Sequence, residues 1–431
     1  MRRQLGSRSS GLVRQSAFRM PRSAIFLLGC LLGDATALAG AAEDYIDAQL
    51  SVVRGLEPRL DEMAEIADLA AARLLTGGHL YLAGEPGMKA ELNGRAGGLC
   101  GAKLYGLDPR RATADDVILF GRYWPTRKPT APDWADLAAT GAMLVLVTPG
   151  QAVLRAVPPK NVWVIPVVGA PAGHVPRVES SEPTALPAKT RAYAQAIAIA
   201  EWTFVAELIG ACRRHRKQLA VYLSIHLDDG QERFKRTQGL LFEPDLKPEP
   251  VPRGQYAREF LGHVRAALEA VKRDEAPKIR QAAGWIREAR AAGRKVVRHL
   301  YGHLPPTEAG LPGDPTFFTD TVTGPVGEQG AEWIRKNLRK GDVYLLVGYQ
   351  QSEDAMAAAA NALGARTIFI TSLPPGPEQA KSPLHLYVNP HWPLTDACLD
   401  LPGYDVKACP LSGIMSLTCY YAICAEALAG Q

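Results

Sequence analysis

The strongest constraint on the fold is a series of short, continuously apolar runs that alternate with segments of helical periodicity. Runs that are apolar at every position are expected of parallel strands covered on both faces. Strands and helices that alternate along a chain form doubly wound sheets. The sequence therefore predicts an α/β protein with mainly parallel sheets. Its strands are expected at 79–83, 116–120, 143–147, 162–165, 296–301, 343–347, 367–371 and 384–388.

The order strand, turn, helix, strand occurs twice, on either side of a proline-rich, charged segment at 242–252. We predict lobe 1 over residues 42–230, a linker over 231–253 and lobe 2 over 254–431. A chain of 431 residues has room for two or three domains. Two tandem copies of one plan are the simplest explanation. The alternative is that unrelated α/β domains share this pattern.

Residues 1–41 have the pattern of a secretory signal. A stretch rich in arginine precedes the apolar run 24–32, and small residues follow at 37–41. The run is too short to span a membrane. We therefore predict an exported protein, periplasmic or extracellular by a Sec-type route, whose mature chain begins near Gly40 or Ala42. The alternatives are a lipoprotein signal at 27–30 and a wrongly assigned start codon, which would leave the protein in the cytoplasm.

The positive charge of the chain is concentrated in this leader. Six arginines and one aspartate lie in residues 1–39, so removal of that segment takes the formal charge from +5 to zero. A neutral body lacks the basic surface that binds phosphate backbones. The sequence predicts no nucleic-acid partner and no membrane-spanning helix.

Six cysteines lie outside the leader, and no two of them form a CxxC pair. They are Cys100, Cys212, Cys398, Cys409, Cys419 and Cys424. Zinc binding is therefore poorly supported, and we expect neither a metal nor a cofactor. Cys419 and Cys424 lie in an apolar helical pattern, where buried free thiols are expected. A bridge between Cys398 and Cys409 is left open.

Two segments of lobe 2 resemble a known family. The stretch 341–356, which opens on Gly-Asp and a strand, and the stretch 361–371, which ends in a strand and Thr, are similar to the central block of SIS (sugar isomerase) domains. The strand and glycine turn that precede this block in the family resemble 80–87 and 298–302. The likeness covers most of 43–225 and 254–431. It implies two flavodoxin-type lobes that bind phosphosugars, which some family members isomerise and others only sense.

The loop at 348–352 departs from the family, whose loop is rich in Ser, Gly and Thr. Here Ser352 is the only hydroxyl of that type, and Glu353 and Asp354 open the following helix. Acidic residues at a helix N-terminus oppose a bound anion. In lobe 1, Glu85 lies in the glycine turn. We therefore expect a neutral or amine-bearing sugar-like ligand to bind better than its phosphate ester.

Ligands of doubly wound proteins bind in the loops at the carboxyl ends of the strands. In lobe 2 we expect the loop Gly348, Tyr349, Gln350, Gln351 and Ser352 to face a cavity shared with Gly302 and His303. In lobe 1 the candidates are Gly84, Glu85, Gly87 and Lys89. No catalytic residue can be assigned.

Other polar residues have simpler explanations. His299 and His303, with Glu308 after them, have the even spacing that places side chains on one face of a strand, as a metal site or an acid-base pair requires. Two solvated or packed histidines at the end of a strand are the preferred explanation. His391 and Asp396 are expected to be loop structure, and Lys89 with Glu91 a solvated ion pair.

Three functions remain open: binding of a sugar-like ligand without strong catalysis, aldose–ketose isomerisation of a phosphosugar, and a structural role with a degenerate pocket. The first is preferred because the phosphate loop is eroded. A homodimer is compatible with each of them.

Overall fold

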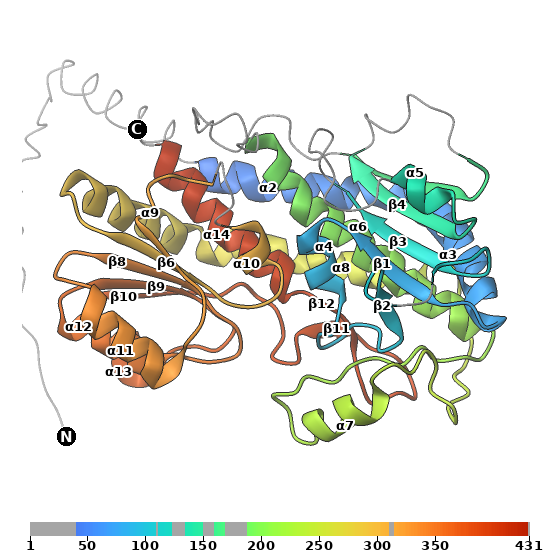
Figure 1. Ribbon diagram of the computed structural model, residues 1–431. Helices are drawn as coiled ribbons and strands as arrows, with labels where there is room; N and C mark the ends of the chain where they lie inside the picture. The colour runs from blue at the N-terminus through green and yellow to red at the C-terminus, as the bar shows by residue number, and fades with distance from the viewer. Residues whose placement is uncertain are drawn as a thin grey trace, which may run out of the picture. The chain divides into compact units, whose positions relative to one another are not determined.

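Two five-stranded sheets, both entirely parallel, form the frame of the protein (Figure 1). The computed structural model describes residues 40–108, 111–122, 134–149, 159–168, 188–309 and 314–429. The predicted leader, apart from its last two positions, lies outside these residues. The described residues from Ala41 onward belong to one structural unit.

The two sheets have the same strand order. The first runs β2-β1-β3-β4-β5, with β1 Leu80–Gly84, β2 Ala102–Leu104, β3 Val117–Gly121, β4 Met143–Pro149 and β5 Val162–Val167. The second runs β7-β6-β8-β9-β10, with β6 Val296–Leu300, β7 Asp320–Val322, β8 Val343–Val347, β9 Arg366–Ile370 and β10 His385–Val388. In each, the second strand in the sequence is an edge strand next to the first. This is the 2-1-3-4-5 order of flavodoxin-like folds, and the predicted fold class is confirmed.

The helices alternate with these strands along the chain. Before and within the first sheet they are α2 Ala41–Leu56, the 3-10 turn Glu57–Arg59, α3 Leu60–Leu75, α4 Pro86–Leu92, α5 Trp134–Ala138 and α6 Ala188–Arg214. In the sequence, the segment that connects the two sheets contains α7 Gly230–Thr237, α8 Gln255–Ala270, a π-helical turn Val271–Glu275 and α9 Ala276–Ala291. The rest are α10 Pro305–Glu308, α11 Gly327–Asn337, α12 Asp354–Ala362, α13 Pro377–Ala380 and α14 Ser412–Ala429. A short antiparallel pair, β11 Ala397–Leu399 and β12 Ala408–Pro410, precedes α14.

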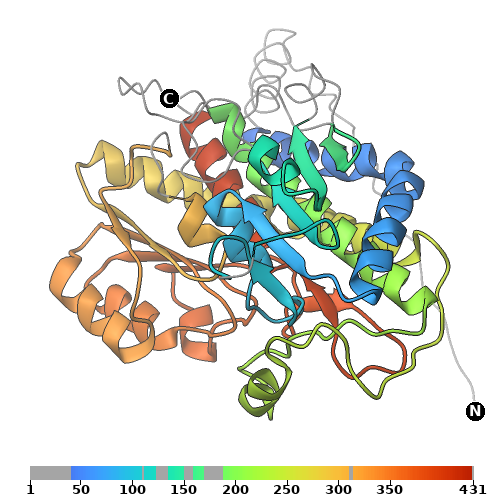
Figure 2. The ribbon, with the colours of Figure 1, turned by 45° about the vertical axis from the view of Figure 1, so that its right-hand side comes forward.

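Strands β1, β3, β6 and β8 are buried at every position, so both of their faces are covered, since alternate residues of a strand point to opposite sides of the sheet. In β8, Val343 and Leu345 join a core that also contains residues of the first sheet, whereas Tyr344 and Leu346 pack with α11 and α12. In β3, Val117 and Leu119 join the same shared core, and Ile118 packs toward α5. Helices α2, α6, α8, α9 and α14 contribute to the shared core between the two sheets (Figures 1 and 2).

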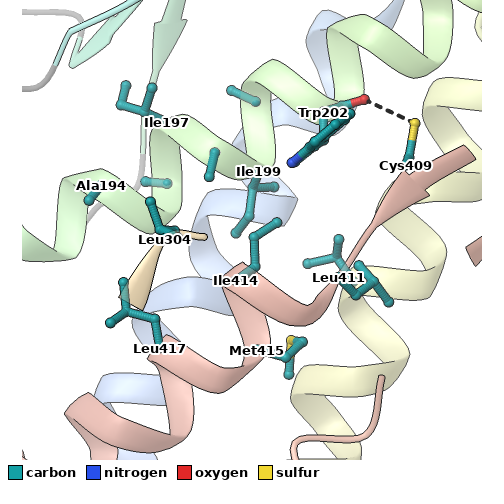
Figure 3. Packing of buried hydrophobic residues seen from close by; sticks show 14 of the residues in the cluster. Ala194, Ile197, Ile199, Trp202, Leu304, Cys409, Leu411, Ile414, Met415 and Leu417 are labelled. Carbon is teal, nitrogen blue, oxygen red and sulfur yellow. Dashed lines mark hydrogen bonds between the residues drawn. The ribbon is translucent and has the colours of Figure 1, made fainter. Parts of the chain in front are cut away.

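Helices α6 and α14 supply much of this shared core. Ile199 of α6 lies beside Ile414 of α14 (Figure 3), and both belong to the shared core together with Leu304 and Leu417. Both helices are long and apolar enough to cross a membrane, over Ala194–Arg214 and Ser412–Ala429. The apolar windows of these helices are 100% and 89% buried inside the protein. Their composition is therefore explained by packing against other parts of the chain.

The strand positions agree with the sequence prediction to within one or two residues. The short strands β2, β7, β11 and β12 were not predicted, since three-residue strands leave little pattern. Helix α7 occupies the first part of the segment predicted to be a linker. All six cysteines of the described chain are buried, and Cys398 and Cys409 are not bridged in this structure.

Candidate ligand-binding site

A cavity of about 580 Å³ lies at the carboxyl ends of β6, β7 and β8. Its wall on this side consists of residues that follow those strands: Leu300, Tyr301, Gly302, His303, Pro306, Thr323 and Tyr349. The chain leaves β6 for β7 on one side and then continues to β8 on the other. The cavity therefore lies at the point where the strand order reverses, which is where doubly wound proteins bind ligands.

The opposite wall comes from the first half of the chain. It consists of Gly94, Arg95 and Ala96 after α4, the segment 223–226, and Gln231, Phe234 and Lys235 of α7. These three residues of α7 lie at positions i, i+3 and i+4, so they share one face of the helix. Phe234 is held by a stack on Tyr222, with ring centroids 4.6 Å apart. One cavity is thus built from both halves.

Three of the residues proposed from the sequence lie on this cavity: Gly302, His303 and Tyr349. Gly348 is buried, and a Cβ there would lie 2.6 Å from Thr371. The Gln350 amide donates to the Leu394 carbonyl, and Ser352 donates to the Asp354 carboxylate at 3.2 Å. Neither residue lines the cavity, and neither does Gln351. The loop after β8 therefore contributes its tyrosine rather than its amides and hydroxyl.

The turn after β6 presents His303 to the cavity. Gly302 has φ of 109°, a conformation that favours glycine. His303 Nδ1 lies 3.2 Å from the Ala90 carbonyl oxygen, which can only accept, so Nδ1 carries the proton and Nε2 a lone pair. Burial, reinforced by the charge of Arg95, lowers the pKa of His303 to about 4. The ring is therefore neutral at pH 7 and offers a hydrogen-bond acceptor.

Tyr349 offers an aromatic surface in a fixed position. Its ring stacks on Trp392 at 5.1 Å between centroids and lies 5.7 Å from the ring of His226. Its hydroxyl donates to the Asp396 carboxylate at 2.9 Å. Burial and the nearby Asp396 charge raise the pKa of Tyr349 above its usual value, so the hydroxyl remains protonated.

A buried polar cluster lies behind this wall. Arg95 Nη1 contacts the Glu91 carboxylate at 2.5 Å, and Arg95 Nη2 donates to Asp396 at 2.8 Å. Nη2 also contacts the Ser412 hydroxyl at 2.6 Å, and the Ser412 N–H donates to Asp396 at 2.9 Å. The cluster joins α4 of the first half to the start of α14. The expectation that Glu91 belongs to a solvated ion pair was wrong, because Glu91 is fully buried. Asp396 lies in a loop, as expected, but it too is fully buried.

Two carboxyl groups in this region are expected to be protonated more readily than usual. Burial raises the pKa of Glu91 to about 7, although Arg95 and the Trp202 indole N–H, 3.1 Å away, oppose the shift. Burial and the charge of Glu91 raise the pKa of Glu201 well above its usual value. Among the described residues, neither oxygen of Glu201 has a hydrogen-bond partner. Neither residue lines the cavity.

The charge of the cavity differs from the sequence expectation. Glu353 accepts a hydrogen bond from the Gly327 N–H at 2.7 Å, and Asp354 accepts one from the Gly376 N–H at 3.0 Å. Both carboxylates are absent from the described cavity wall, which contains no Asp or Glu. Its cationic groups are Arg95, balanced by Asp396 and Glu91, and Lys235, which is exposed. The predicted repulsion of an anion therefore loses its basis.

The lobe 1 candidates do not reach this cavity. Gly84 has φ of 108°, and a Cβ there would lie 2.1 Å from the Gly121 carbonyl oxygen. A Cβ at Gly87 would lie 1.9 Å from the Glu308 carboxylate. Glu85 and Lys89 are half-buried at the start of α4. The corresponding glycine turn in the first sheet is therefore closed by the Gly121 backbone and by the Glu308 side chain.

The remaining candidates are dispersed. His299 is buried within β6 and lies 2.7 Å from the Tyr344 hydroxyl. His303 lies beyond the strand, after the Gly302 turn, so the two rings are not a pair. His391 lies 3.5 Å from Glu275. Within the described ranges, no group of three or more His, Cys, Asp or Glu side chains is arranged to hold a metal.

Several wall residues were missed in the sequence, notably Arg95, His226 and the α7 residues. Arg95 lies four positions after Glu91, a spacing that predicts an ion pair on a helix face but not its burial. The spacing of Gln231, Phe234 and Lys235 is that of one helix face. The proline-rich stretch that follows concealed this short helix.

Comparisons with known proteins give only distant likeness. The chain matches no protein-family model and no curated protein sequence. Among solved structures it is similar to a proposed phosphosugar isomerase from Silicibacter pomeroyi, with 14% identity, 90% of this chain and 97% of that chain covered, and a TM-score of 0.39. A proposed sugar-binding protein from Salmonella typhimurium has 10% identity, 90% and 98% coverage, and a TM-score of 0.44. A proposed phosphosugar isomerase from Clostridium difficile has 9% identity, 89% and 92% coverage, and a TM-score of 0.42.

Proposed function

We propose that this protein binds a small sugar-like molecule in the cavity at the carboxyl end of the second sheet. The observation that carries the proposal is the cavity itself, which lies at the strand-order switch point and combines two aromatic rings with a few fixed polar groups. Tyr349 and Phe234 supply apolar surfaces for the C–H face of a sugar ring. His303, Ser224 and Gln231 supply hydrogen-bonding groups for its hydroxyls.

We also propose that the two halves are divergent tandem SIS-type lobes. The identical 2-1-3-4-5 order of both sheets and the resemblance of 341–356 to the family support this. The ligand then belongs to the class of sugars and sugar phosphates. Since Lys235 is exposed on the cavity wall and no carboxylate lines the described wall, a phosphate ester is favoured over its neutral sugar.

Binding is better supported than catalysis. Isomerisation requires a base that moves a proton between adjacent carbons. His303 is a neutral candidate whose ring proton is directed away from the cavity, but its pKa of about 4 makes it a weak base. Glu91, with a pKa of about 7, lies outside the cavity wall. The open cavity in turn disfavours a purely structural role.

A thermal-shift screen of the purified full chain against neutral sugars and sugar phosphates tests the proposal, since a ligand of the native state raises its melting temperature. The blocking variant is Ile225→Trp, at a wall residue that is 49% exposed and tolerates a larger side chain. The control is Leu69→Trp on α3, which is 44% exposed and distant from the wall in sequence and fold. A ligand that raises the melting temperature of wild type and of Leu69→Trp, but not that of Ile225→Trp, supports the site. Equal shifts in all three exclude it.

We further propose that the protein is exported. The basic, apolar and small-residue segments of 1–41 support this. Mass spectrometry of protein isolated from its native host should find a mature N-terminus near Gly40 or Ala42. An intact Met1 terminus would contradict export by a cleaved signal.

A further inference from the structure

Two cysteines lie directly opposite each other in the β11–β12 pair. Ala397 faces Pro410 and Leu399 faces Ala408 in the antiparallel register, so Cys398 and Cys409 lie between the same two pairs, at opposed positions. Opposed Cα atoms in such a pair are about 4.5–5.5 Å apart. This falls within the range of about 4.4–6.8 Å that a disulfide requires. None of the other four cysteines of the described chain lies in this strand pair.

The two thiols share one buried environment. Cys398 Sγ donates to the backbone oxygen of Cys409 at 3.2 Å, so its sulfur already points toward the opposite residue. Cys409 Sγ donates to the Trp202 carbonyl at 3.8 Å (Figure 3). Both hydrogen bonds are weak, because a thiol is a poor donor. Rotation of the two side chains toward each other therefore breaks only weak hydrogen bonds and costs little free energy.

The backbone at Cys409 is unusual for a residue with a side chain. Its φ is 59°, in the left-handed region, and its N–H donates to the Gly97 carbonyl at 3.0 Å rather than to β11. A non-glycine residue there costs roughly 1–2 kcal/mol. Such an outlier is a reason to look for a function of the side chain.

We infer that Cys398 and Cys409 form a disulfide when the chain folds in the presence of a small-molecule disulfide oxidant such as oxidised glutathione. One thiolate attacks the oxidant, which forms a mixed disulfide and releases one glutathione thiolate. The second cysteine thiolate attacks the cysteine sulfur of the mixed disulfide, which closes the Cys–Cys bond and releases the second glutathione as a thiolate. Two cysteine thiols are thereby oxidised, and one oxidised glutathione is reduced to two glutathione molecules.

The timing follows from burial. Both thiols are almost completely buried in the folded chain, and burial raises the pKa of Cys398 and of Cys409 above the usual range. The thiolate is the reactive form, so the folded, reduced chain reacts slowly. The bridge therefore forms before the strand pair is covered by α6 and α8, and it resists reduction afterwards.

The bridge would close the loop that carries two members of the polar cluster. Asp396 immediately precedes β11, and Ser412 follows β12 by two residues. Both bind Arg95 at the cavity wall. A covalent link between the strands fixes the distance between these two residues. The inference does not depend on what the cavity binds.

Peptide mapping tests the inference. The denatured, reduced full chain is refolded with oxidised and reduced glutathione, alkylated, and cleaved with trypsin and cyanogen bromide. Trypsin cleaves after Lys407, between the two cysteines, and cyanogen bromide cleaves after Met415, which separates Cys409 from Cys419 and Cys424. We expect the fragment with Cys398 to be linked to 408–415 with a loss of two hydrogen masses. Recovery of both fragments alkylated, or of Cys398 linked elsewhere, overturns the inference.

Two variants of the proposed bridge, one control variant and a stability measurement complete the test. Cys398→Ala and Cys409→Ala should each abolish the linked fragment, whereas Cys212→Ala, at a buried cysteine of α6, should leave it unchanged. The oxidised wild type should melt roughly 3 °C above its reduced form, a difference absent from both variants. If a variant does not fold, the wild-type fragment map alone decides. An equal melting temperature for oxidised and reduced wild type would contradict a native-compatible bridge.

Discussion

The Tyr349 hydroxyl donates a hydrogen bond to Asp396 at 2.9 Å, and through this contact the cavity wall is joined to the buried cluster at the start of α14. Asp396 also accepts from Arg95 and from the backbone and hydroxyl of Ser412. The loop after β8, helix α4 and helix α14 therefore meet at one carboxylate. The position of the Tyr349 ring therefore depends on Asp396 and Ser412, which do not themselves line the cavity.

Replacement of Asp396 by Asn should be strongly destabilising. The Arg95–Asp396 pair is fully buried, and removal of one partner leaves a buried charge without full compensation, at a cost of about 3 kcal/mol. Urea unfolding measures the change. The control is Asp400→Asn, whose ion pair with Lys407 is exposed and should contribute less than about 0.5 kcal/mol. Similar losses in both variants would mean that the cluster does not hold this region together.

Lys235 should select for charged ligands. If a sugar phosphate binds, Lys235→Met should lower its affinity roughly fivefold, which is the effect of one partly exposed charge contact. The affinity for the neutral sugar should stay the same. Arg236→Met removes the same charge one residue away, from a side chain that lines a different cavity beside Tyr404. It should change either affinity by less than about twofold. Calorimetry on both variants distinguishes a local contact from a general charge effect. An equal loss for sugar and phosphate would show that Lys235 acts through packing.

The frame of the fold was predictable because it depends on patterns along single segments. Continuous apolar runs such as 343–347 occur only where both faces of a strand are covered, and the glycine turns after β1 and β6 mark where the chain turns away from a sheet. The sites of Gly302, His303 and Tyr349 follow from the rule that loops at the carboxyl ends of neighbouring parallel strands meet.

The other wall of the cavity was not predictable in the same way. Arg95, His226 and Lys235 approach the second sheet only through packing between the two halves, and no periodicity in the sequence encodes that contact. The charge argument failed for a related reason. Glu353 and Asp354 open α12 as predicted, but their carboxylates bind the backbone N–H groups of Gly327 and Gly376, which are distant in sequence.

The stability conferred by Glu201 should depend on pH. Burial raises its folded-state pKa well above the usual value, so the folded chain keeps this carboxyl protonated while the unfolded chain ionises above about pH 4.5. The unfolded state then holds fewer protons, and wild-type stability falls as pH rises from there toward the folded pKa. Glu201→Gln has no proton to lose. Its stability relative to wild type should therefore be greater at pH 8 than at pH 5.

Urea unfolding of wild type and Glu201→Gln at pH 5 and pH 8 measures this difference. Glu249→Gln is the control, because Glu249 has a side chain that is 82% exposed and should give the same difference from wild type at both pH values. A Glu201→Gln effect that is equal at the two pH values would show that Glu201 is ionised in the folded chain.

The position of α7 should depend on Arg233. Its guanidinium donates to both oxygens of Asp405, one of them at 2.8 Å, and lies 5.4 Å above the ring of Tyr404. These contacts hold the helix from the side opposite the cavity, so that Phe234 and Lys235 face the wall. Arg233→Met removes the paired hydrogen bonds, and we expect amide hydrogen exchange over 230–237 to become roughly tenfold faster. The ligand affinity should fall in parallel.

Lys407→Met provides the matched control for Arg233→Met. Lys407 lies in the β11–β12 loop, which also carries Asp405, and it pairs there with the exposed Asp400. The substitution removes a cation from that loop without removing a contact of α7. Exchange over 230–237 should therefore stay at the wild-type rate. If Arg233→Met leaves both exchange and affinity unchanged, the stack of Phe234 on Tyr222 alone holds the helix. If exchange increases while affinity is unchanged, α7 borders the cavity without taking part in binding.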